Sequence, residues 1–204
     1  MINAPVVTYA RHRMKVDGDG VTTLVCFHGC PLRCQSCLNP FTLDPEGKRT
    51  MMTPQELYDK VKIDNLYFIA TGGGVTFGGG EPLLYPEFLV EFREKCGKAW
   101  HLCAETSLNV PWENVAAAEK CIDEFIIDCK DTNPDIYRRY TGRDNDGMLE
   151  NLSRLVALTG PERVLLRLPL IPDYNTEVDR QNSRTLLEGL GITRFDCFTY
   201  RRER

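Results

Sequence analysis

The sequence predicts an α/β fold built on a parallel sheet, and three observations support this prediction. Short apolar segments alternate with helical stretches six times along the 204 residues. Several of these segments, such as Phe125-Ile126-Ile127, have the unbroken apolar character of strands buried on both faces. Helix start and stop signals separate them. Six units are too few for a closed eight-stranded barrel, so we predict a partial, laterally open (β/α)6 barrel with its chemistry at the carboxyl ends of the strands.

The elements follow in chain order. The predicted strands are Val21–Phe27, Val75–Phe77, His101–Thr106, Glu124–Lys130, Val164–Leu170 and Arg194–Tyr200. The predicted helices are Pro54–Ile63, Pro86–Cys96, Trp112–Lys120, Pro134–Tyr140, Met148–Leu158 and Glu177–Leu187. Thr53 and Glu56 form a capping box with proline at the first helical position. Asn175 or Thr176 is expected to cap the last helix, and Gly189 and Gly191 to end it.

Composition and charge exclude several classes of protein. Hydrophobic residues make up 42% and charged residues 26%, as in ordinary globular proteins, and the net charge of −4 gives no general attraction to nucleic acid. No segment approaches the roughly 18 apolar residues that cross a bilayer, and we see no leader peptide. We therefore expect a cytoplasmic protein with neither nucleic acid nor membrane as partner. No linker divides the chain, so we expect one domain over residues 1–204.

The cysteines carry the strongest chemical signal. Nine cysteines in a reducing compartment indicate metal binding, chemistry or packing more than disulfides. Cys30, Cys34 and Cys37 form a C-x3-C-x2-C loop directly after the first predicted strand. Three thiolates can hold three corners of an iron–sulfur cubane and leave one iron open, whereas simple electron transfer normally uses a fourth cysteine. We expect the cysteines outside this loop to be free thiols, among them Cys96, Cys103, Cys121, Cys129 and Cys197.

Two alternatives to a three-cysteine cluster stay open. Structural zinc sites normally use two separated ligand pairs, and no second C-x2-C or H-x3-H occurs here. Cys26 is the other alternative, because it precedes Cys30 by four residues and would give a non-catalytic iron–sulfur or zinc module if it were a fourth ligand. We place Cys26 inside the first strand. His12, His28 and His101 are isolated and are expected to pack or to form hydrogen bonds.

Further polar residues stand at the predicted strand ends. Gly78-Gly79-Gly80-Glu81-Pro82 follows the second strand, where glycines either form a tight turn or let a ligand approach the backbone. Asp128 and Lys130 lie two residues apart and so share a face, either as a salt bridge or as ligand contacts. Arg167 interrupts an apolar strand, as an ion-pair partner or as a ligand contact.

Together these motifs resemble the radical S-adenosylmethionine (SAM) superfamily, and more narrowly its glycyl radical enzyme activating enzymes of the pyruvate formate-lyase activating type. The cysteine loop is followed by Leu38-Asn39, and the glycine run matches the superfamily's G-G-E-P motif. Asp17-Gly18-Asp19-Gly20-Val21 resembles the D-G-P-G-I entry of the activating enzymes, with Asp19 in place of proline. The similarity extends from about residue 6 to residue 175 and implies the radical SAM type of partial barrel.

The resemblance implies roles for individual residues. Cys30, Cys34 and Cys37 would be catalytic as the holders of a [4Fe–4S] cluster. The residues that would bind SAM are Ser36, Leu38, Asn39, Gly79, Gly80, Glu81, Asp128, Lys130 and Arg167. Glu105 and Thr106, with Asp128, would hold a monovalent cation beside SAM. Residues Asn133–Gly142 would form a docking or structural helix.

The resemblance also implies a reaction and its partners. SAM would bind the open iron, an external flavodoxin or ferredoxin would supply one electron, and cleavage would give methionine and a 5′-deoxyadenosyl radical. The radical would take hydrogen from a glycine of a glycyl radical enzyme, the protein substrate of a monomeric activase. The alternative is a radical SAM enzyme on a small molecule, such as the 7-carboxy-7-deazaguanine synthase group, whose loop typically reads Cys-Asp-Thr where this one reads Cys37-Leu38-Asn39.

Three departures from the family pattern matter. No cysteine lies between Leu38 and Phe77, so we expect one cluster and no ferredoxin-like insert. Ser107-Leu108 replaces the usual Asn-Gly or Ser-Gly after the Glu105-Thr106 pair. Residues Tyr200–Arg204 stand where longer relatives continue with a segment that bears a histidine near the adenine, so adenine recognition is expected to differ.

Overall fold

One eight-stranded sheet organises the computed structural model, which describes residues 2–200. Its strand order is β3-β1-β2-β4-β5-β6-β7-β8, so β3 and β8 are the two edges and the sheet is open. The strands are β1 (Ala4–Met14), β2 (Val21–Phe27), β3 (Thr50–Met52), β4 (Gly74–Gly79), β5 (His101–Thr106), β6 (Glu124–Asp128), β7 (Val164–Leu170) and β8 (Phe195–Thr199). The predicted α/β class and open barrel are confirmed.

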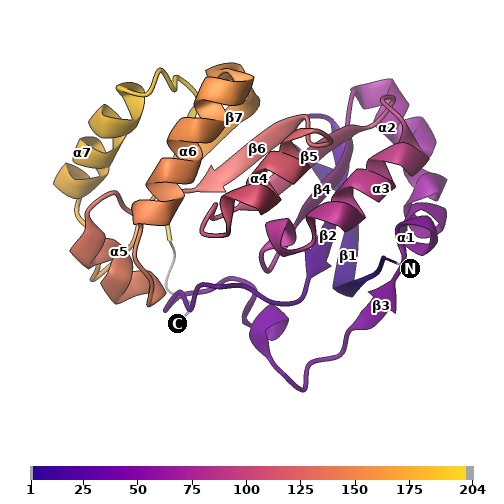
Figure 1. Cartoon of the computed structure of the whole chain (residues 1–204), viewed down its shortest axis with the longest axis horizontal. Helices are drawn as coiled ribbons and strands as arrows, with labels where there is room; N and C mark the ends of the chain where they lie inside the picture. The colour runs from indigo at the N-terminus through magenta and orange to yellow at the C-terminus, as the bar shows by residue number, and fades with distance from the viewer. Residues whose placement is uncertain (1, 201–204) are drawn as a thin grey trace.

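Helices follow most strands. They are α1 (Pro54–Val61), α2 (Asn65–Thr71), α3 (Pro86–Cys96), α4 (Trp112–Glu119), α5 (Pro134–Thr141), α6 (Asp146–Thr159) and α7 (Glu177–Glu188). Short 3-10 helices cover Pro40–Leu43, Lys62–Asp64, Pro82–Leu84 and Pro161–Arg163. Figure 1 shows α3, α4 and α6 along one face of the sheet, and each packs against the next. No helix among residues 2–200 is long and apolar enough to cross a membrane.

The six predicted strands are the parallel part of the sheet. β2, β4, β5, β6, β7 and β8 pair in parallel, each with the next. Three of these strands have other bounds than predicted, and the third, β8, is one residue shorter at each end. β4 continues through Gly78 and Gly79, so the glycine run ends this strand and does not follow it. β6 stops at Asp128, because the Cys129 amide turns to the carbonyls of Ile127 and Arg167.

The sequence did not predict two strands and one helix, which are β1, β3 and α2. β1 and β3 pair antiparallel with their neighbours at one side of the sheet. Only Ala4 and Val6 of β1 are buried, and the strand is irregular, with positive φ at His12, so it lacks the apolar pattern of a buried strand. The predicted helix Pro54–Ile63 ends at Val61, and α2 follows the next turn with Phe68 as its one buried residue. Neither β1 nor α2 buries enough apolar surface to give its sequence a periodic apolar pattern.

Helix caps agree with the sequence. Thr53 forms the predicted capping box with Glu56, and Thr176 forms one with Asp179. Such caps contribute about 1 kcal/mol each. Asn175 is not the cap, since its side chain accepts from the Ile171 amide instead. Gly191 takes the left-handed φ of +84°, whereas Gly189 stays right-handed, so only Gly191 uses the freedom of glycine to end α7.

An aromatic cluster fills the space between the sheet and its first helices. Phe27 and Phe77 of adjacent strands stack with ring centroids 5.8 Å apart, and Phe88 and Phe92 of α3 meet them edge-on. Trp100 extends the cluster, and all five side chains are buried. This packing fixes β2 and β4 beside each other, so the loops that follow these strands emerge next to one another at the carboxyl edge.

Candidate active site

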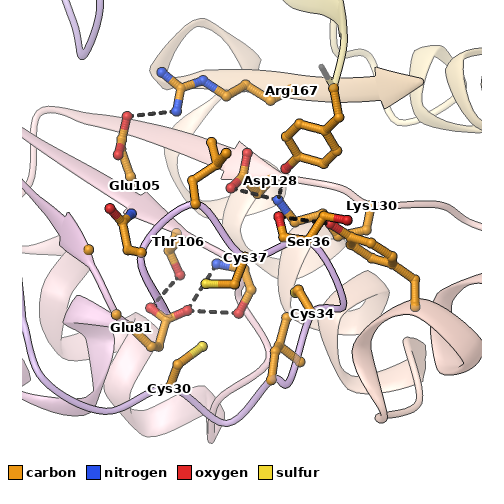
Figure 2. A pocket seen from close by; sticks show the side chains of 18 residues that line it. Cys30, Cys34, Ser36, Cys37, Glu81, Glu105, Thr106, Asp128, Lys130 and Arg167 are labelled. Carbon is orange, nitrogen blue, oxygen red and sulfur yellow. Dashed lines mark hydrogen bonds and ion pairs between the residues drawn. The ribbon is translucent and has the colours of Figure 1, made fainter. Parts of the chain in front are cut away.

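One pocket at the carboxyl edge of the parallel strands gathers every predicted site residue. Figure 2 shows its lining, which comes from the carboxyl ends of β4, β5 and β6, from β7, from the loops after β2, β4, β5 and β6, from α5 and from the residue after β8. The lining residues are Cys30, Leu32, Cys34, Ser36, Cys37, Leu38, Asn39, Gly79, Gly80, Glu81, Glu105, Thr106, Ser107, Asp128, Lys130, Tyr140, Arg167 and Tyr200. This is the end of the sheet at which the partial barrel was predicted to carry its chemistry.

The cysteine loop is bound to the end of α5. Its backbone amides of Arg33 and Gln35 donate to the carbonyls of Thr141 and Tyr140 at the end of α5, over 2.8 and 3.1 Å. The Arg33 side chain in turn donates to the Cys30 carbonyl. The helix predicted from Asn133–Gly142 therefore has a structural role, because its last turn positions the loop that carries the thiols.

The three thiols are spread more widely than ligands of a single ion. Among residues 2–200, one group of histidine, cysteine and carboxylate atoms lies close enough to share one ion, and Cys30, Cys34 and Cys37 do not form it. A cubane is larger than an ion, so its corner ligands stand further apart. Burial raises the pKa of Cys30 to about 12 and raises that of Cys34, so both thiols need a compensating positive centre to ionise.

Cys26 lies apart from the loop. It is buried within β2, and a side chain on Gly79 would come within 2.5 Å of its Cβ. Burial raises its pKa to about 11. Cys26 is not among the described residues that line the pocket, so its position agrees with a strand thiol.

The glycine turn is bound tightly to the start of the cysteine loop. The Gly80 amide donates to the Phe27 carbonyl at 3.0 Å, and the Glu81 amide donates to the Gly29 carbonyl at 2.7 Å. A Cβ on Gly80 would lie 2.2 Å from the Gly29 carbonyl oxygen, and Gly79 has a φ of +82°. Glycine is therefore required at both positions to bring two backbone segments together beside the thiols.

The Glu81 carboxylate organises the floor of the pocket. Oε1 accepts from the Thr106 hydroxyl and the Leu83 amide at 2.7 and 3.1 Å, and Oε2 from the amide and hydroxyl of Ser107 at 2.9 and 2.7 Å. A carboxylate has about four lone-pair positions, and these bonds use them. Burial raises the pKa of Glu81, and the bonds oppose this effect. A ligand amino group would therefore meet the backbone of this turn more readily than the carboxylate.

Lys130 is buried at the pocket wall between two partners. Its Nζ donates to Asp128 Oδ2 at 2.9 Å and to the Tyr200 hydroxyl at 2.8 Å. Burial alone would lower its pKa, but Asp128 and Tyr200 outweigh this and raise it well above its usual value. The ammonium has three donors, and these two described partners use two. Lys130 lies just beyond the end of β6, yet it shares a side with Asp128 as predicted.

Arg167 makes an ion pair within the sheet. Its Nη1 lies 2.6 Å from Glu105 Oε1, and its Nη2 donates to the Val16 carbonyl at 3.0 Å. Burial raises the pKa of Glu105, while Arg167 acts against that rise. Figure 2 shows the pair at the side of the pocket away from Cys30. Arg167 therefore forms the ion pair, and because it also lines the pocket, its contact with a ligand stays a prediction.

Four lining residues were missed as site residues: Leu32, Ser107, Tyr140 and Tyr200. Tyr140 and Ser107 lie in motifs whose residue types alone predict no ligand contact for them. Tyr200 ends the last predicted strand, and its ring lies near Tyr140, with centroids 6.5 Å apart. Residues 201–204, which complete the segment predicted to alter adenine recognition, lie outside the described residues.

Comparison with protein families decides the assignment that this geometry suggests. Residues 24–180 match the family model of the Radical SAM superfamily. The chain belongs to this superfamily. Membership implies a [4Fe–4S] cluster and SAM, and the donor set fits them: three thiols lie on one fastened loop, with a polar pocket beside them.

Curated relatives narrow the radical SAM assignment to the activating enzymes of glycyl radical enzymes. The chain is 39% identical to the indoleacetate decarboxylase activating enzyme of Tractidigestivibacter scatoligenes, covering 78% of this chain and 70% of the relative. It is 33% identical to the pyruvate formate-lyase-activating enzyme of Staphylococcus aureus (strain USA300), covering 80% of this chain and 67% of the relative.

A solved structure supports the fold. SuiB of Streptococcus suis bound to S-adenosylmethionine superposes with a TM-score of 0.66 at 13% identity, over 88% of this chain and 42% of that one. The radical SAM chain thus spans less than half of SuiB, and at this identity the likeness concerns the fold alone.

Replacing Lys130 by alanine is expected to weaken SAM binding by about 1.5–3 kcal/mol, because a charge-assisted hydrogen bond would be lost. Anaerobic calorimetry on the cluster-loaded protein measures the affinity. Tyr200→Phe is the matched control, since it removes one Lys130 partner and keeps the ammonium. Equal affinities of wild type and Lys130→Ala would make the Asp128–Lys130 pair a purely structural salt bridge.

Proposed function

We propose that this radical SAM chain is a glycyl radical enzyme activase of the pyruvate formate-lyase activating type. The observation that carries the proposal is the single pocket that joins the three loop cysteines to the glycine turn and to Asp128 and Lys130. The activating-enzyme relatives support the choice of a protein glycine as substrate. When bound, the cluster and SAM would supply a reductively generated carbon radical that abstracts hydrogen from this glycine.

The chain's own residues would hold and shield these groups. Cys30, Cys34 and Cys37 would bind the cluster from a loop fastened to α5. Ser36, Leu38 and Asn39 of the same loop would border SAM, and the backbone of Gly79 and Gly80 would lie against its amino group. Lys130 would pair with its carboxylate through the remaining N–H, and Glu81 would keep Thr106 and Ser107 in place.

The exposed surroundings of the loop support protein partners. Leu38 is 72% exposed and Phe41 43% exposed, so a protein can approach the cysteine loop closely. We assign the electron-donor role to a flavodoxin or ferredoxin and regard the activase as a cytoplasmic monomer. The open sheet edges β3 and β8 leave the barrel unclosed, which would admit a peptide loop of the substrate enzyme.

Two finer assignments remain proposals. A monovalent cation at Glu105, Thr106 and Asp128 would have to share Glu105 with Arg167, which already lies 2.6 Å from its Oε1. We propose a single radical SAM domain without a ferredoxin-like insert, because the interval between the cysteine loop and β4 forms β3, α1 and α2 and contains no cysteine.

Glycyl radical formation tests the proposed function. The reconstituted enzyme is incubated anaerobically with SAM, a reductant and either pyruvate formate-lyase or indoleacetate decarboxylase as probe. A doublet EPR signal on the probe protein, absent without the enzyme, is the expected result. A peptide copied from the probe's radical loop should react more weakly, because remote binding energy positions the glycine. Consumption of a purine or pterin precursor, with no glycyl radical on either probe, would favour the small-molecule alternative.

A further inference from the structure

A second group of potential metal ligands lies at the opposite end of the strands from the pocket. His101 begins β5, Cys103 follows two residues later, and Glu124 begins β6 and pairs with Cys103 in register. Residues two apart on a strand share a face, so His101, Cys103 and Glu105 point to the same side of the sheet. Glu105 lines the active-site pocket, and His101 and Cys103 therefore lie below it on that face.

The three side chains lie close enough to share one ion, and Cys103 Sγ also donates a weak hydrogen bond to Glu124 Oε2. One atom from each of the three side chains lies within 4.8 Å of the others. His101 Nε2 is 3.8 Å and Cys103 Sγ 3.7 Å from Glu124 Oε2. A nitrogen–oxygen separation of 3.8 Å is too long for a hydrogen bond. Ligands of a tetrahedral zinc ion, with bonds of about 2.0–2.3 Å, lie roughly 3.3–3.7 Å apart.

A close outer contact holds one of the three residues. Glu124 Oε1, the oxygen that does not face the group, pairs with Arg194 at 2.6 Å. His101 Nδ1 lies 3.9 Å from Asp123 Oδ2, too far for a hydrogen bond, and this oxygen accepts from the Leu102 amide at 2.7 Å. Metal-binding histidines and carboxylates are usually oriented by such outer partners. By contrast, His12 and His28 make ordinary hydrogen bonds of 2.9 Å, as expected from the sequence.

The partly exposed imidazole gives a way into the group. Cys103 and Glu124 are buried, whereas the His101 side chain is 37% exposed, so an ion would enter past the imidazole. Gly18, of the Asp17–Val21 motif, covers the thiol: a Cβ there would lie 3.0 Å from Cys103 Sγ. The absence of a side chain at Gly18 keeps space around the sulfur, and this gives a physical reason for a glycine in the motif.

We propose that His101, Cys103 and Glu124 bind a single divalent transition-metal ion, with zinc favoured by the nitrogen, sulfur and oxygen ligand set. Three protein ligands leave a fourth position for water or an external ligand. The site is separate from the cluster loop and does not depend on the proposed activase function. An ion pair between protonated His101 and Glu124 is the competing account.

The test measures zinc in the cluster-loaded protein. Wild type is incubated with a slight excess of zinc, desalted and analysed for metals, and zinc K-edge X-ray absorption identifies the ligands. We expect about one zinc in addition to about four irons, with one sulfur at about 2.3 Å and nitrogen or oxygen ligands otherwise. His101→Ala and Cys103→Ala should each retain about tenfold less zinc. Cys121→Ala is the control, because Cys121 is also a buried thiol on a different part of the chain.

Several results would overturn the proposal. The first is that the wild-type protein retains no zinc. The second is that His101→Ala and Cys103→Ala retain as much zinc as Cys121→Ala does. The third is that the zinc is bound by three sulfurs and iron is lost. The last result would place zinc in the Cys30–Cys37 loop. His101 is partly exposed, so His101→Ala tests the site even if Cys103→Ala fails to fold.

Discussion

Replacing Cys30, Cys34 or Cys37 by alanine is expected to abolish the iron–sulfur cluster, whereas Cys26→Ala should keep it. Each loop cysteine lines the pocket, and a cubane that already has one open iron does not tolerate the loss of a second ligand. Cys26 is buried in β2 against Gly79. Wild type and Cys26→Ala should therefore contain about four irons per chain after anaerobic reconstitution, and the three loop variants almost none.

Iron analysis and EPR spectroscopy check this result. The reduced cluster of wild type and Cys26→Ala should give an EPR signal that changes when SAM is added, because SAM would reach the open iron. A cluster lost in Cys26→Ala, with the fold intact by circular dichroism, would restore the four-cysteine alternative and remove the open iron from the account.

The second large effect is a loss of folding stability when Glu81, at the floor of the pocket, is replaced. Glu81→Gln is expected to lower the free energy of unfolding by on the order of 3 kcal/mol, because buried donors would lose their acceptors. The Leu83 amide faces one carboxylate oxygen and the Ser107 amide faces the other. Either orientation of the glutamine therefore turns its NH2 group against a backbone N–H.

Urea denaturation followed by circular dichroism measures this effect. Glu94→Ala is the control, since Glu94 is an exposed glutamate on α3. A Glu81→Gln variant within about 0.5 kcal/mol of Glu94→Ala would show that the network around Glu81 contributes little to the fold.

Most of the parallel sheet could be predicted because its strands are buried on both faces. Phe125, Ile126 and Ile127 are fully buried and contiguous, so their segment carries a clear signal. β1 is half exposed and bulged, and the seven-residue α2 buries only Phe68, so local sequence gives neither of them a pattern. Their positions depend on contacts with distant segments, such as the pairing of Ala4 with Met52.

The site could be predicted where residue types and spacing determine the chemistry, and less well where contacts do. The cysteine loop and glycine turn are local motifs, and the structure places both at one pocket. The partners of individual side chains are not local: Tyr200 is 70 residues from Lys130, and Arg167 is 62 residues from Glu105. His101, Cys103 and Glu124 approach one another only through the register of β5 and β6, so their separate positions in the sequence gave no sign of a shared site.

The transfer of deuterium from a protein glycine to 5′-deoxyadenosine tests the activase proposal most directly. Pyruvate formate-lyase and indoleacetate decarboxylase, each labelled with glycine deuterated at the α-carbon, are incubated separately with the reconstituted enzyme, unlabelled SAM and a reductant. Mass spectrometry should find deuterium in the 5′-deoxyadenosine together with the glycyl radical signal for at least one probe, because hydrogen abstraction joins the two products. Unlabelled 5′-deoxyadenosine with both probes, formed at the same rate without them, would contradict a protein glycine as the substrate.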